Sequence, residues 1–182
     1  MRCTILIDGS NFYFKLKDLE ISNLLDFNFA EFSKHLAKNA KIVKTVYFVG
    51  KIQTDGSQKA NQLLKNQQRL FAHLSNNGVE YSLGYLLKIG NIYHEKGVDV
   101  NLATNILVSA YENLADQIIV ISSDTDLLPA INKAIEIGKT VLHIGFKHKI
   151  SRAMISNCSR YWLLSKSELL RFISKKSSVN NR

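Results

Sequence analysis

The chain has 182 residues, 46% of them hydrophobic, which suits one globular domain with a sizeable core. No apolar run approaches the ~20 residues of a membrane span, and the N-terminus enters a strand with no room for a signal peptide, so we expect a soluble, cytoplasmic protein. Lysine and arginine number 24 against 15 acidic residues, and this net charge of +9 favours a polyanionic partner, with nucleic acid the commonest.

Apolar β-branched runs and helical patterns alternate along the chain. Strands are expected over residues 4–7, 42–49, 79–83, 117–122, 140–144 and 161–164. Helices are expected over residues 12–19, 30–40, 57–76, 98–113, 127–137, 150–156 and 165–173. Asn77-Gly78 is expected to end the longest of them with a C-cap in the left-handed conformation. This alternation predicts an α/β fold: a three-layer α/β/α sandwich with a mainly parallel, Rossmann-like sheet and right-handed crossovers.

One segment interrupts the alternation. Two short apolar runs flank Ile89-Gly90-Asn91 and predict a small hairpin arm over residues 85–94, whose role is either a homodimer contact or a substrate clamp. No linker divides the chain, so we expect a single domain over residues 1–174. Residues 175–182 form a polar, basic tail that is expected to fray.

Acidic residues follow two of the expected strands. Asp8 comes directly after the first strand, and Asp124 and Asp126 come after the strand Ile118–Ile121. In an open parallel sheet the carboxyl ends of the strands lie at one edge, where ligands bind, so these carboxylates are expected to meet. Each acid taken singly also suits a helix cap, but one cap needs only one aspartate.

A further acid comes from a helix. Asp99 stands in the first turn of the helix expected over residues 98–113, three and four positions before Leu102 and Ala103. It is therefore expected on the face that packs against the sheet, where a lone carboxylate is costly to bury. Several carboxylates at one place require a cation, and oxygen ligands select Mg²⁺ or Mn²⁺ over zinc. Such ions can activate a water molecule for hydrolysis of a phosphodiester.

Three ordered segments resemble the motifs of the NYN domain, the LabA-like branch of the PIN-like nucleases: Ile7–Asn11, Lys96–Ala103 and Ser122–Leu127. The resemblance covers residues 3–165 and implies a PIN-like fold and a metal-dependent ribonuclease. It implies that Asp8, Asp99 and Asp124 are the metal ligands, Asp126 a further acidic residue and Asn11 a polar group of the site.

The chain departs from that family pattern at two positions. Asn105 stands where the family helix often carries an acid, and Ser123 stands where glycine is common. An amide in place of that acid is expected to weaken a metal site or to alter substrate choice. However, six residues exceed one helical turn, so position 105 faces away from Asp99 and is not expected to hold the same ion.

Other polar residues suggest how nucleic acid is held. Lys51, Lys96, Lys147 and Arg152 are candidates for contacting an RNA backbone, and each alone also suits a solvated surface charge. Tyr85, Tyr93 and Phe146 are candidates for base stacking, with core packing the plainer interpretation. The histidines and the two cysteines, Cys3 and Cys158, show no zinc spacing, and no disulfide is expected.

The function that these features favour is hydrolysis of single-stranded RNA with Mg²⁺ or Mn²⁺. One alternative is a catalytically degenerate RNA-binding or interaction module, which Asn105 supports and the retained acids oppose. A lesser alternative is a phosphatase acting on a small phosphate ester through Asp8, but that chemistry needs an acid where Ser10 stands.

Overall fold

A computed structural model of the chain describes residues 1–21, 23–54, 56–89 and 92–174, with the backbone alone for 85–89 and 92–96. The strands are β1 (Arg2–Asp8), β2 (Lys41–Val49), β3 (Glu80–Leu83), β4 (Tyr85–Ile89), β5 (Ile92–Lys96), β6 (Gln117–Ile121), β7 (Thr140–Phe146) and β8 (Arg160–Leu164). The helices are α1 (Gly9–Asp18), α2 (Phe29–Ala37), α3 (Gln58–Asn76), α4 (Val98–Tyr111), α5 (Leu128–Glu136), α6 (Arg152–Asn157) and α7 (Lys166–Leu170), with 3-10 turns η1 (Leu24–Asp26) and η2 (Thr125–Leu127).

Six strands form one parallel sheet in the order β3-β2-β1-β6-β7-β8. The central strands β1 and β6 are apolar and buried on both faces, as strands of a parallel sheet are. In the register of the sheet, Asp8 lies opposite Phe48 of β2, and Ile7 lies opposite Ile121 of β6. The residues that follow β1 and β6 therefore meet at the carboxyl edge of the sheet.

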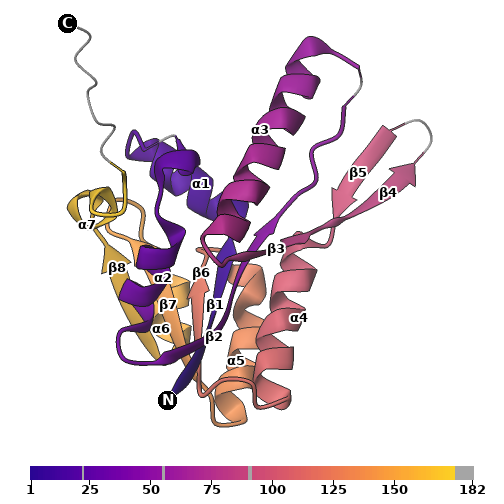
Figure 1. Cartoon of the computed structure of the whole chain (residues 1–182). Helices are drawn as coiled ribbons and strands as arrows, with labels where there is room; N and C mark the ends of the chain where they lie inside the picture. Colours follow the sequence, from indigo (N-terminus) through magenta and orange to yellow (C-terminus); the bar gives the residue numbers. More distant parts are fainter. Residues whose placement is uncertain (22, 55, 90–91, 175–182) are drawn as a thin grey trace, which may run out of the picture.

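Helices cover both faces of the sheet (Figure 1). Side chains of α1, α2, α3 and α7 form one core with alternate strand residues: Phe12, Leu16, Phe29, Phe32, Leu36, Leu74 and Leu169. Side chains of α4, α5 and α6 form the core on the other face: Leu102, Ile106, Ala110, Ile131, Ala134 and Met154. The predicted three-layer α/β fold with a parallel sheet is confirmed.

Two elements project beyond the carboxyl edge. Figure 1 shows the far end of α3 and the arm formed by β4 and β5 both rising above the sheet. The arm is the predicted hairpin: β4 and β5 pair antiparallel, from Tyr85 opposite Lys96 to Ile89 opposite Ile92. Its strands extend to Lys96, two residues past the predicted limit.

The helix that follows the first strand begins earlier than predicted. It starts at Gly9 and not near Phe12, because the Asp8 carboxylate accepts the backbone N–H of Asn11 and so caps α1. The turn η1 and the short bridge between Phe27 and Ile173 were not predicted. The left-handed residue after α3 is confirmed at Gly78, whose φ is +69°.

Other expectations can be compared with the described residues. None of the helices there is long and apolar enough to cross a membrane. Cys3 and Cys158 are both free thiols, as expected. The predicted fraying of residues 175–182 falls outside the described residues, so the domain limit at residue 174 stays a prediction.

Candidate active site

The candidate site lies where the chain leaves β1 and β6 in opposite directions. After β1 the chain enters α1 on one face of the sheet, and after β6 it enters η2 and α5 on the other. Neighbouring parallel strands whose helices diverge in this way leave a crevice at their carboxyl ends. Asp8 and Asp124 stand on its two sides.

Asp8 is held by two hydrogen bonds. Its side chain is buried, with 6% of the residue exposed. Oδ1 accepts the backbone N–H of Asn11 at 2.9 Å, and Oδ2 accepts the hydroxyl of Ser122 at 2.8 Å. A carboxylate fixed through both oxygens has one orientation, so the position of Asp8 is set before any ligand arrives.

Ser122 connects the two strands. While its hydroxyl donates to Asp8, its Oγ accepts the backbone N–H of Asp124 at 3.1 Å. Asp124 in turn accepts the N–H of Asp126 at 2.9 Å through Oδ1 and caps η2. Asp8 and Asp124 are therefore both helix caps and members of one hydrogen-bonded chain, so a capping role does not exclude a role in a ligand site.

Asp99 lies in the first turn of α4 and forms no capping bond there. The expectation that it packs against the sheet is wrong, because its side chain is exposed while Leu102 and Ile106 take the buried positions. The partial positive charge at the helix N-terminus favours a carboxylate at this position.

The acids influence one another electrostatically. Burial raises the pKa of the Asp8 carboxyl, and the charge of Asp124 raises it too, against the lowering effect of the bonds from Asn11 and Ser122. Partial burial raises the pKa of Asp99, and so do the charges of Asp124, Asp8 and Asp126. No ion pair joins these acids to a lysine or arginine in the described part of the chain. The structure thus brings all four predicted acids close enough to repel one another.

The donor groups suit a hard cation. Mutual repulsion of carboxylates is relieved by positive charge, and the Asn11 Oδ1 atom adds a buried oxygen with no hydrogen-bond partner among the described residues. As the side chains stand, no three His, Cys, Asp or Glu residues of the described chain are arranged as a metal-binding group. The predicted ligands are therefore gathered at one edge but not closed around an ion.

A groove lies between α1 and α3, and none of the four acids lines it. It has a volume of about 560 Å³ and begins at Gly9 and Ser10, directly after Asp8. Phe14 and Leu63, which are 59% and 46% exposed, line it together with Arg69. Exposed apolar side chains beside a cation are the surface that a nucleic-acid base and its phosphate require.

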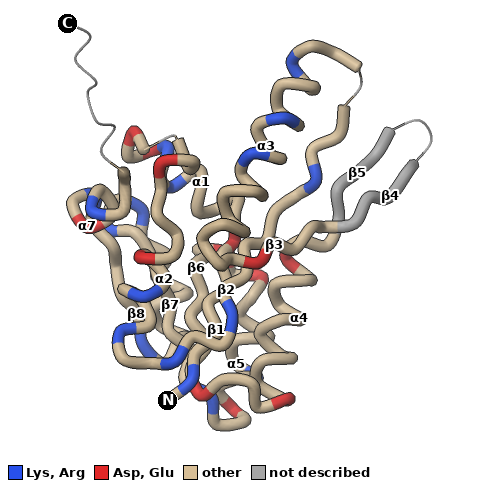
Figure 2. The backbone as a smooth tube through the Cα atoms, viewed as in Figure 1, with Lys and Arg blue, Asp and Glu red and all other residues tan. Residues whose placement is uncertain are grey.

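The lysine and arginine side chains of helix α3 have no acidic side chain beside them on the same helix. The helix carries Lys59, Lys65 and Arg69 and no acidic residue. Figure 2 shows these cations along α3 above the edge where α4 begins with an acidic residue. This helix was predicted from the sequence but assigned no part in RNA binding, and the groove was not predicted. The helix's lack of acidic residues and the neighbouring aromatic pair Tyr13 and Phe14 were signals.

The predicted basic contacts lie at the same edge but apart from the acids. Lys51 follows β2, Lys147 follows β7, and Arg152 begins α6; all three are exposed. The side chains of Lys96, Tyr85 and Tyr93 fall outside the described residues. Phe146 is buried in the core and packs against Phe12, so it does not stack on a base.

Asn105 belongs to a different polar cluster. Its Oδ1 accepts the Lys44 ammonium at 3.0 Å, and its Nδ2 donates to the backbone oxygen of Asn101 at 3.0 Å. The amide at position 105 thus supports the packing of α4 on β2 and forms no hydrogen bond with the four acids.

Comparisons with known proteins identify the family of the chain and a structure with a similar fold. The model of the NYN domain matches residues 2–165, which confirms the resemblance found in the motifs. A crystal structure of a protein of unknown function from Vibrio parahaemolyticus has a TM-score of 0.67 at 19% identity, over 90% of this chain and 92% of that one. The two chains share a fold. The comparison with curated proteins found no match.

Two bacteriophage T5 structures are more distantly similar. A 5′-exonuclease with bound divalent metal ions (zinc) has a TM-score of 0.42 at 16% identity, over 85% of this chain and 60% of that one. A flap endonuclease in complex with DNA and metal ions has a TM-score of 0.43 at 14% identity, over 78% of this chain and 55% of that one.

Proposed function

Since the chain belongs to the NYN domain family, we propose that it is a metal-dependent ribonuclease that hydrolyses phosphodiester bonds of single-stranded RNA. The observation that carries the proposal is the chain of hydrogen bonds from Asp8 through Ser122 to Asp124. Asp99 lies close enough for the charges of Asp8 and Asp124 to raise its pKa. Two rigidly held carboxylates beside a third can bind the cation that phosphodiester hydrolysis uses. On a surface that only binds RNA, the same carboxylates would repel the phosphate backbone.

In this proposal Asp8, Asp99 and Asp124 hold Mg²⁺ or Mn²⁺, and the Asn11 side-chain oxygen lies free to orient a water molecule or phosphate. A divalent ion bound there supplies Lewis-acid activation of water and stabilises charge on the phosphate. Ser122 keeps Asp8 and the Asp124 backbone in position, and exposed Asp126 completes the acidic pocket and positions water.

The basic surface orients the substrate. Arg69 and its neighbours on α3 attract the RNA backbone, largely without reading sequence. An unpaired base enters the groove beside Gly9 and packs on Phe14, which places the adjoining phosphate at the acids. A base held in a duplex is not free to enter this groove, so single-stranded RNA is the favoured substrate.

The proposal is tested by incubating labelled single-stranded RNA with the protein and Mn²⁺ or Mg²⁺, with an EDTA control and a matched binding assay. Metal-dependent cleavage supports the ribonuclease. Tight binding without cleavage, unaffected by EDTA, would instead identify a degenerate RNA-binding module.

Metal binding is expected to stabilise the fold. At Mn²⁺ about 100-fold above its Kd, unfolding becomes about 2.7 kcal/mol less favourable, which raises the Tm of a chain of this size by about 5–10 °C. Asp99→Asn removes a repelled charge, so its metal-free Tm is expected to equal or exceed that of the wild type while its response to Mn²⁺ falls by half or more. Thermal unfolding with and without Mn²⁺ measures both.

Glu112→Gln is the matched control because it neutralises an exposed acid at the far end of the same helix. It is expected to keep the full response to Mn²⁺. Equal Mn²⁺ responses in the wild type and both variants would remove Asp99 from the ligand set.

The groove is expected to act on substrate binding. Phe14→Ala removes a stacking surface worth about 1–3 kcal/mol, so KM for single-stranded RNA rises about 5- to 150-fold while kcat changes little. Steady-state kinetics measure the two constants separately. Tyr111→Ala is the control, since Tyr111 is an aromatic residue with the same 59% exposure at the end of α4, away from the groove. A similar KM for both variants would exclude the groove as an RNA contact.

A further inference from the structure

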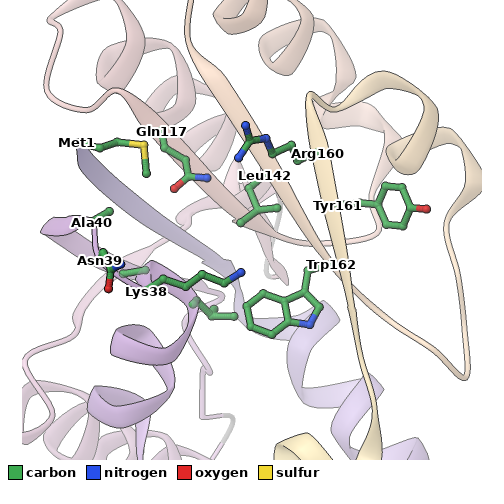
Figure 3. A pocket seen from close by; sticks show the side chains of 11 residues that line it. Met1, Lys38, Asn39, Ala40, Gln117, Leu142, Arg160, Tyr161 and Trp162 are labelled. Carbon is green, nitrogen blue, oxygen red and sulfur yellow. The ribbon is translucent and has the colours of Figure 1, made fainter.

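A second cavity lies at the edge of the sheet opposite the acids. It has a volume of about 710 Å³ and lies between the end of α2 and β8, with Leu142 of β7 at its floor (Figure 3). Leu36 and Ala37 of α2 and Trp162 of β8 add apolar walls. Because parallel strands begin at this edge, the cavity is separated from Asp8 and Asp124 by the length of the sheet.

Two cations face this cavity. Lys38 and Arg160 form no ion pair with any residue of the described ranges. Figure 3 shows their charged groups turned toward the cavity on either side of Leu142. Two unpaired cations beside an apolar floor favour a ligand that combines concentrated negative charge with an apolar body.

Gln117 adds a buried polar group. The residue is only 6% exposed, and its amide forms no hydrogen bond with a described residue. Its side chain points into the cavity (Figure 3). The amide atoms are not among the buried polar atoms that lack a partner, so they remain accessible from the cavity and offer a donor and an acceptor to a ligand.

The backbone of Lys38 is a separate indication. It has φ 52° and ψ −113°, a conformation that suits glycine and strains a lysine. The lysine side chain lies over the Trp162 ring, with Nζ 4.9 Å from its centroid. A strained residue that presents a cation to a cavity is typical of a binding site.

We propose that this cavity binds a nucleotide through its phosphate monoester, either free or at the 5′ end of an RNA chain. Lys38 and Arg160 bind the phosphate, Gln117 bonds to an edge of the base, and Leu142 with the wall of Trp162 packs against its apolar surface. This site is independent of the proposed ribonuclease site, because it shares no residue with it.

The probe is AMP, and Trp162 reports on it because it is the chain's one tryptophan. AMP is expected to change the fluorescence of the full chain saturably, and calorimetry gives the affinity. Adenosine, which lacks the phosphate, and inorganic phosphate, which lacks the base, are each expected to bind at least about tenfold more weakly. If 5′-phosphorylated RNA binds as AMP does while 5′-hydroxyl RNA does not, the ligand is the 5′ end of an RNA chain. If only free AMP binds, the ligand is a mononucleotide.

Lys38→Gly and Arg160→Gln are each expected to weaken AMP binding by more than about tenfold. Lys38→Gly is expected to have the same Tm as the wild type or a higher one, because glycine adopts this backbone conformation without strain. A loss of AMP binding in this variant would therefore not be due to unfolding. Lys133→Gln, which removes a cation on the other face of the sheet, is the control and is expected to bind normally. No saturable AMP binding, or equal losses in all three variants, would overturn the site. Binding that is lost in Asp124→Asn but kept in Lys38→Gly would overturn it as well.

Discussion

Asp124→Asn is expected to lower metal-dependent cleavage of single-stranded RNA by about 10³-fold. A metal ligand of this kind supplies several kcal/mol of transition-state stabilisation, and about 4 kcal/mol corresponds to that factor. The asparagine oxygen can still accept the N–H of Asp126, so the cap of η2 is retained. The backbone N–H of residue 124 can likewise still donate to Ser122. The loss is therefore expected in activity and not in folding.

The measurement is the initial rate of cleavage of labelled RNA in Mn²⁺, with RNA binding measured in parallel in EDTA. Glu136→Gln is the control, because it neutralises an exposed acid whose only ion pair in the described chain is with Lys133. It should cleave at the wild-type rate, since exposed ion pairs contribute little. Cleavage that persists in Asp124→Asn would assign the activity to another site or to a contaminant.

Gly9→Ala is expected to destabilise the fold by about 3 kcal/mol or more, or to prevent folding. A Cβ atom at this position would lie 2.3 Å from Cε1 of Tyr47 and 2.6 Å from the backbone oxygen of Phe48. Phe48 belongs to the interior of the sheet, and the Tyr47 hydroxyl donates to the Gly9 carbonyl oxygen at 3.0 Å. Neither neighbour can move aside without disturbing the sheet next to Asp8.

Urea-induced unfolding followed by circular dichroism measures this effect. Ser10→Ala is the control, because Ser10 is the next residue of α1 and its side chain is exposed. Its free energy of unfolding is expected to stay within about 0.5 kcal/mol of the wild type. A Gly9→Ala protein as stable as Ser10→Ala would show that this close packing is not required.

Much of the fold follows from patterns within short windows. The run Ile118–Ile121 is β-branched and apolar, which makes it a buried strand in any parallel sheet, and β6 is found there. Likewise, Ser165 and Glu168 form the capping box of the predicted final helix. In both cases the residues that determine the structure are within a few positions of one another.

The candidate site follows from sequence only in part. The acids at the strand ends could be predicted to share an edge, because strand direction alone places them there. The start of α1 was misplaced, since Asp8 is both the last residue of a strand and a helix cap. Asp99 was wrongly expected to be buried, because helical spacing does not show how far the first turn extends past the sheet.

What the sequence determined by itself is the alternation of strands and helices, the three-layer fold and the carboxyl-edge location of Asp8, Asp124 and Asp126. Only the tertiary structure decided that Ser122 bonds Asp8, which lies 114 residues earlier in the chain, that α1 and α3 enclose a groove, and that Lys38 and Arg160 face one cavity. The physical reason is range: backbone propensity and hydrophobic period act between near neighbours in the chain. Hydrogen bonds between distant residues and cavities depend instead on which distant segments pack together. Patterns within short stretches of the sequence do not show this packing.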